Sequence, residues 1–325
     1  MEQGGRNSEA GLIPDAGRVI PGAGDSSIAE TRDFLDTPAP MADPLAAYEK
    51  LRHTFAADVK SEENQILLGQ VFEASIRFLA KAGVKPLKSL VPGKDYFAFA
   101  AGKKLSRAVN KGLFVSDLGE WEAFRKAIGW NRVPTMDSER ITRIIYSLAV
   151  SFFCFIDLTK DGDQKTPGTF FEYLIGHLFA WRLGVNPKTR LPVLNLDMEA
   201  TLPTDFIFDL GPNRAKFHLP IKVSTRERVI QVWAHQRVLN GVYGTGRFLG
   251  TPVILTETKT DKKKQEVIEI CLPDQWRIYQ MHIAELKRIY YLDLPASYAK
   301  LNEVFPPLSV KPFGHFFAEA DTLPI

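Results

Sequence analysis

Three charged residues in the second half of the chain have the types and order that phosphodiester hydrolysis requires: Glu172, Asp205 and Lys222. Glu172 lies in the apolar segment GTFFEYLIGHLF, Asp205 begins the run TDFIFDL after Thr204, and Lys222 lies in HLPIKVS. Carboxylate oxygens bind Mg²⁺, and a lysine beside them can hold a phosphate or orient a water. The pattern therefore predicts a site for metal-assisted cleavage of a phosphodiester, with Asp209 as an alternative ligand to Asp205.

A second charged run follows directly after the lysine. Arg226, Glu227 and Arg228 come at the beginning of the expected helix RVIQVWAHQRVL. Arginine donates two parallel hydrogen bonds to guanine O6 and N7, and glutamate accepts one from cytosine N4. Such a run can contact consecutive G and C bases in a major groove; the alternative is an ordinary solvated loop.

The elements expected to position these residues alternate between helix and strand. GTFFEYLIGHLFAWRLG and RVIQVWAHQRVLNG have helical periodicity, as does QWRIYQMHIAELKRIYYL. Short strands are expected between these helices, and the two that contain Asp205 and Lys222 are neighbours in sequence. The fold class is therefore predicted as α/β (α+β), a mixed central sheet flanked by helices, in which Asp205 and Lys222 meet at one sheet edge.

Composition divides the chain into three regions. Residues 1–45 hold 6 Gly, 5 Pro and 8 Asp or Glu against 3 Arg, so residues 1–43 are predicted to be a flexible acidic tail. Residues 44–160 are predicted to be a helical N-terminal region, and residues 161–325 the catalytic and DNA-contacting core. The formal charge of the whole chain is +3, so the part after the acidic tail is basic, which is compatible with a polyanionic partner.

The two cysteines, Cys154 and Cys271, are too few for a disulfide framework or a thiolate zinc site. Free buried thiols fit a reducing cytoplasm. We expect no signal peptide, because no basic segment precedes an apolar run at the beginning of the chain. The longest apolar stretch, residues 144–156, is too short to span a bilayer, so no membrane association is expected.

Taken together, these residues resemble the group of type II restriction endonucleases that recognises CCGG, within the PD-(D/E)XK nuclease superfamily. The resemblance covers about residues 165–245. It implies that Asp205 and Glu172 bind Mg²⁺ and that Lys222 joins them in catalysis. It also implies that Arg226, Glu227 and Arg228 recognise CC:GG base pairs, in CCGG or an interrupted CCNGG. A homodimer on palindromic double-stranded DNA, within a restriction-modification system, is the expected assembly.

One position departs from the family pattern. The second acid would stand two residues before the lysine, where this chain has Pro220, or thirteen residues after it, where it has His235 followed by Gln236. Either side chain can supply a neutral ligand or hold a water, but neither replaces the negative charge. Two other functions therefore stay open: a non-catalytic DNA-binding protein on a degenerate nuclease fold, and a repair or structure-selective nuclease.

Overall fold

The computed structural model describes residues 43–129, 132–195, 198–226, 229–261 and 263–323. The predicted tail therefore lies outside the described residues, except for Asp43, whose side chain accepts a hydrogen bond from Leu45 N at the beginning of the first helix. The α-helices are α1 (Pro44–Ala57), α2 (Glu62–Leu79), α3 (Leu118–Ala127), α4 (Ser138–Thr159), α5 (Lys165–Leu183), α6 (Val229–Tyr243), α7 (Pro273–His282), α8 (Ala296–Ala299) and α9 (His315–Glu319). A 3₁₀ turn, η3 (Lys300–Asn302), follows α8.

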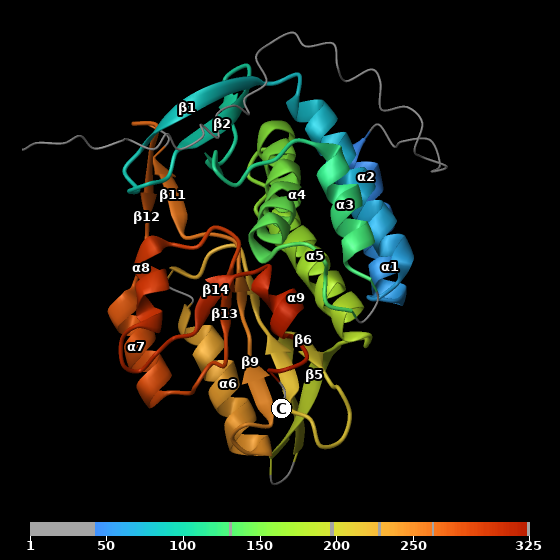
Figure 1. Ribbon diagram of the computed structural model, residues 1–325, viewed down its shortest axis with the longest axis vertical. Helices are drawn as coiled ribbons and strands as arrows, with labels where there is room; N and C mark the ends of the chain where they lie inside the picture. Colours follow the sequence, from blue (N-terminus) through green and yellow to red (C-terminus); the bar gives the residue numbers. More distant parts are fainter. Residues whose placement is uncertain (1–42, 130–131, 196–197, 227–228, 262, 324–325) are drawn as a thin grey trace, which may run out of the picture. The chain divides into compact units, whose positions relative to one another are not determined.

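Helices α1 to α5 pack against one another on one side of the molecule (Figure 1). Helix α4 lies at their centre: it is long and apolar enough to cross a bilayer, but 89% of its most apolar window is buried inside the protein. Its phenylalanines meet aromatic rings of α1 and α5, such as Phe152 against Phe170 with ring centroids 4.4 Å apart. We therefore identify α4 as a core helix.

The strands form three hydrogen-bonded groups. They are β1 (Gly83–Ser89), β2 (Tyr96–Ala101), β3 (Lys104–Leu105), β4 (Val109–Asn110), β5 (Lys188–Asn195), β6 (Met198–Phe208), β7 (Lys216–Leu219), β8 (Ile221–Lys222), β9 (Phe248–Gly250), β10 (Val253–Ile254), β11 (Thr258–Asp261), β12 (Glu266–Glu269), β13 (Ile289–Tyr291) and β14 (Val310–Pro312). One group has the order β5-β6-β7-β9, a second the order β14-β13-β10-β8, and a third the order β11-β12-β1-β2-β3 with β4 beside β2.

The first two groups make one continuous curved surface. Strands β7 and β8 are separated only by Pro220, which lacks an N–H to donate and fixes its own φ. Hydrogen bonds run across this break, from Thr251 N to His218 O at 2.8 Å and from Val253 N to Pro220 O at 2.9 Å. Strands β5, β6 and β7 are antiparallel, whereas β8, β10, β13 and β14 are parallel. The expected mixed central sheet is therefore present, curved where the proline interrupts it.

The N-terminal region is not wholly helical. Strands β1 to β4 follow α2, and β1 pairs in parallel with β12 through Lys88 and Glu266. Pro86 lies in β1 where this strand pairs with β2, opposite Phe97. Residues 41–325 cluster as one compact unit. The division at residue 160 remains a prediction, and the pairing of β1 with β12 shows that both regions contribute to one sheet.

Candidate active site

Asp205 and Lys222 meet where β6 passes the break between β7 and β8. The Lys222 Nζ donates to Asp205 Oδ2 at 2.8 Å, and the backbone N–H of Ile221 donates to the same oxygen at 2.7 Å. The side chain of Asp205 is 23% exposed and that of Lys222 is 28% exposed, so both can be reached from solvent. The single strand expected to contain Lys222 is divided by Pro220 into β7 and β8, and only β7 pairs with β6, but the two side chains still meet. Asp209, the alternative ligand, pairs with Lys216 instead, 2.5 Å away.

Glu172 reaches the same place from α5, which packs on β6 and β8. Most residues of α5 are buried, whereas Glu172 is half-buried. The close approach depends on Gly176, one turn further along: a Cβ there would lie 2.7 Å from Cε2 of Phe206, the residue after Asp205. The absence of a side chain at Gly176 therefore lets the helix that carries Glu172 lie on the strand that carries Asp205.

The charge of Glu172 is coupled to this pair. Burial is the main cause that raises the pKa of Glu172, and the negative charge of Asp205 adds to it; Lys222 opposes both effects, and the resulting pKa is about 6. A carboxylate that responds to Asp205 and Lys222 in this way lies within electrostatic range of both. Perturbed carboxyl groups of this kind occur at functional sites more often than elsewhere.

The donor chemistry of the site fits a magnesium ion. Mg²⁺ prefers oxygen ligands and is usually held by one or two carboxylates, with waters and substrate phosphates completing its coordination. Asp205 and Glu172 supply two carboxylates beside a solvent-accessible strand end. Within the described part of the chain, no group of three or more His, Cys, Asp or Glu side chains is arranged to hold a metal alone. A metal here would therefore take its remaining ligands from water and DNA.

His235 and Gln236, the two residues considered in place of the displaced acid, have different surroundings. Gln236 is buried: its Nε2 donates to Phe248 O at 2.8 Å, and its Oε1 lies 3.0 Å from Nδ1 of His218. Burial lowers the pKa of His235, Asp205 raises it and Lys222 lowers it, so His235 lies within electrostatic range of both charged residues. The amide of Gln236 joins α6 to β7 and β9. The replacement of the displaced acid by either residue remains a prediction.

The expected base-contacting residues follow β8. Arg226 is exposed and has a left-handed backbone, with φ of 36°. Such a conformation is uncommon for a residue other than glycine. Glu227 and Arg228 lie outside the described residues.

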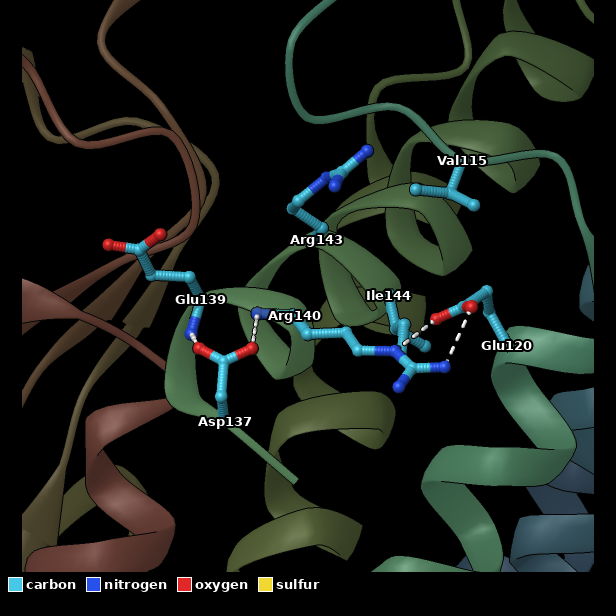
Figure 2. Close-up of a pocket in the computed structure, with 7 residues that line it drawn as sticks. All are labelled: Val115, Glu120, Asp137, Glu139, Arg140, Arg143 and Ile144. Atoms are coloured by element: carbon cyan, nitrogen blue, oxygen red, sulfur yellow. Dashed lines mark hydrogen bonds and ion pairs between the residues drawn. The ribbon is translucent and has the colours of Figure 1, made fainter. Parts of the chain in front are cut away.

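A separate hollow of about 320 Å³ lies at the beginning of α4 (Figure 2). Arg140 extends across it to form two hydrogen bonds with Glu120, and Asp137 caps the helix by accepting from the backbone N of Glu139 and Arg140. Arg140 and Glu120 are thus paired with each other, and the hollow contains none of the predicted site residues.

No protein-family model matches the chain, and none of the curated proteins matches it. Among solved structures, the chain is similar to the type IIP restriction endonuclease Kpn2I, with a TM-score of 0.71 and 25% identity over 87% of this chain and 97% of that one. The fold is that of a restriction endonuclease.

This result confirms the predicted fold class, and it supports the predicted class of enzyme. A weaker similarity, with a TM-score of 0.36 and 13% identity, is to the restriction endonuclease PspGI in complex with substrate DNA, over 57% of this chain and 76% of that one.

Two residues at the site were not found by sequence analysis. Gly176 has no signal beyond being a glycine inside an apolar helix, which is itself a hint of close packing. Glu257 lies between β10 and β11 and contacts the loop between Lys222 and Arg226. Its role depends on a contact between segments more than 30 residues apart, which no local pattern shows.

Proposed function

We propose that this protein is a type II restriction endonuclease that cleaves double-stranded DNA at a palindromic site with a CC:GG core, either CCGG or the interrupted CCNGG. The observation that carries the proposal is the contact between Lys222 and Asp205 beside Glu172, within a fold similar to Kpn2I over 97% of that enzyme's length. We also propose a cytoplasmic location, which the two free cysteines fit.

The three residues divide the work between charge and position. Lys222 places a positive charge beside the scissile phosphate, where it offsets the negative charge that develops on the phosphoryl oxygens and orients the attacking water. Asp205 holds the lysine in place through Oδ2. Asp205 and Glu172 would hold Mg²⁺, which when bound supplies charge stabilisation at the phosphate. The products would carry 5′-phosphate and 3′-hydroxyl ends.

Base recognition is assigned to Arg226, Glu227 and Arg228. The exposure of Arg226 leaves its guanidinium free to enter a major groove, a few residues from the catalytic lysine. A donor–acceptor–donor order suits consecutive G and C bases. Two copies related by a two-fold axis would place two such loops on one palindrome, so the expected form on DNA is a homodimer.

A second candidate function is favoured by Pro220 and His235. Both stand where an acid is expected, so the metal site has fewer negative charges than the family pattern provides. If this loss removes catalysis, the protein is a sequence-specific DNA-binding protein on a nuclease fold.

The proposal is tested by incubating the purified protein with phage DNA and Mg²⁺. Discrete fragments that disappear when EDTA is added support a restriction endonuclease. A smear indicates a repair or structure-selective nuclease. Intact DNA together with a sequence-specific gel shift indicates the non-catalytic protein.

A further inference from the structure

The buried carboxylate of Glu257 contacts the loop between Lys222, which is proposed for catalysis, and Arg226, which is proposed for base recognition. Glu257 is 1% exposed, and it accepts hydrogen bonds from Ser224 Oγ at 2.8 Å and from Thr225 Oγ1 at 2.5 Å. The backbone N–H of Thr225 donates to both carboxylate oxygens, at 3.1 and 3.2 Å. From the opposite side, the hydroxyl of Tyr291 donates to Oε1 at 2.9 Å. A buried group with this many donors is a firm anchor, because losing any one bond leaves a polar atom without water.

The same short segment also holds the catalytic lysine. After β10, Leu255 N donates to Lys222 O at 3.0 Å and Thr256 N donates to Val223 O at 3.2 Å. At the next two residues, Ser224 and Thr225, the contacts are hydrogen bonds to the side chain of Glu257 instead of to the backbone. One stretch of chain, residues 255–257, therefore fixes every residue from Lys222 to Thr225.

Arg226 is the residue directly after this series of contacts. Its φ of 36° is a conformation that persists in a non-glycine residue only when neighbouring structure imposes it. The hydrogen bonds that the preceding residue, Thr225, donates to Glu257 supply that constraint. Loss of these hydrogen bonds would allow Arg226 to change its direction relative to Lys222.

We propose that Glu257 is a positioning residue for sequence recognition. It fixes the Ser224–Arg226 loop against the strand that carries Lys222, so that the base-contacting and cleaving residues keep a fixed position relative to each other. This inference rests on the proposed function for its consequence in DNA binding, but the anchoring of the loop does not. The carboxylate is suited to this task because all its partners donate hydrogen bonds to it, and the backbone N–H of Thr225 can act only as a donor. A glutamine would turn an NH₂ group toward one of these donors.

The test compares Glu257→Gln with Tyr291→Phe, each of which removes hydrogen bonding at the same buried group. Tyr291→Phe acts on the side away from the loop and therefore controls for lost stability. Discrimination is measured as the ratio of the Kd for a scrambled duplex to that for a CC:GG duplex, without Mg²⁺. We expect Glu257→Gln to lose about tenfold or more of this ratio, the size of one displaced base contact, while its affinity for the scrambled duplex stays near wild type. Tyr291→Phe should keep the wild-type ratio.

Hydrogen exchange of the free protein gives a second readout that needs no DNA. Backbone amides of residues 223–226 should exchange faster in Glu257→Gln than in Tyr291→Phe at matched stability. Thr225→Val removes the hydroxyl that donates to Glu257 from the loop, and it should behave like Glu257→Gln. If Glu257→Gln does not fold, Thr225→Val is used in its place. Unchanged discrimination and unchanged exchange in Glu257→Gln, or equal losses in Tyr291→Phe, would overturn the inference. If the wild-type protein prefers no CC:GG duplex, the proposed function fails, while the exchange data still decide whether Glu257 anchors the loop.

Discussion

Lys222 and Asp205 are 17 positions apart in the chain, yet the Nζ of one lies 2.8 Å from the Oδ2 of the other. The antiparallel pairing of β6 with β7 brings the two segments together, and Pro220 then ends β7, so that the N–H of Ile221 points to Asp205 rather than to a strand partner. The interruption that removes the usual acid from position 220 thus also shapes the contact on which the proposed chemistry depends.

This contact predicts a large loss of cleavage in Lys222→Ala and in Asp205→Asn. Removal of one preorganised charged group from an active site costs roughly 10²- to 10³-fold in rate. Binding of the specific duplex without Mg²⁺ should remain, because these side chains serve the phosphate and not the bases. Lys216→Ala is the matched control, since Lys216 forms a similar pair with Asp209 on the neighbouring strand. Equal single-turnover rates in Lys222→Ala and Lys216→Ala would contradict the assignment.

Glu172 predicts a pH dependence of stability that a surface carboxylate would not show. Its pKa rises from 4.5 to about 6 on folding, so between these values the folded protein retains a proton that the unfolded chain has released. The free energy of unfolding therefore falls as pH rises through this window, by up to about 2 kcal/mol. In metal-free buffer, Glu172→Gln should be more stable than wild type at pH 8 by up to that amount, and nearly equal to it at pH 4.5. Urea unfolding measures both values.

The same residue predicts the pH dependence of activity. Only the ionised carboxylate is a good ligand for Mg²⁺, so the cleavage rate should rise as pH increases through about 6. Glu172→Gln should cleave slowly and without this step. A wild-type rate that does not change between pH 5 and 7.5 would argue against a role for Glu172 in the chemistry.

Gly176 predicts a coupling between helix packing and activity. In Gly176→Ala, the new Cβ would lie 2.7 Å from the Phe206 ring, so α5 must shift away from β6. Overpacking of this kind costs about 1–3 kcal/mol, and the shift should also move Glu172 and slow cleavage. Gly168→Ala, on the same helix with no atom near its Cβ, should be neutral or stabilising by up to about 1 kcal/mol. Equal effects of the two substitutions on unfolding and cleavage would contradict this packing.

Arg226 predicts a loss of specificity rather than a general loss of affinity. One bidentate base contact gives roughly 1–3 kcal/mol of discrimination, and a two-fold complex uses it twice, so Arg226→Ala should cost about 2–6 kcal/mol on the specific duplex. A phosphate-binding arginine would instead weaken all sequences alike and reduce the salt dependence. Glu227→Ala is a sharper test, because a carboxylate gains nothing from the charge of DNA; unchanged preference for a CC:GG duplex in that variant would remove the base-contacting role from this segment.

The parts of the fold that sequence predicted are those set by local pattern. Periodicity was enough for α5 and α6, and strand adjacency was enough to join Asp205 to Lys222. The helix expected to run to Leu292 ends at His282, and RIYYL contains β13, because pairing with β10 and β14 outweighs its helical periodicity. The surroundings of Gln236 likewise could not be predicted, since only tertiary packing shows that its amide forms hydrogen bonds with His218 and Phe248.

The most direct test of the central claim is to sequence the fragment ends from a Mg²⁺ digest of phage DNA, with Lys222→Ala as the matched control. We predict that every wild-type end maps to one palindromic motif with a CC:GG core, and that Lys222→Ala produces such ends roughly 10²- to 10³-fold more slowly. Ends without a common motif, or the same ends at the same rate from Lys222→Ala, would contradict this prediction.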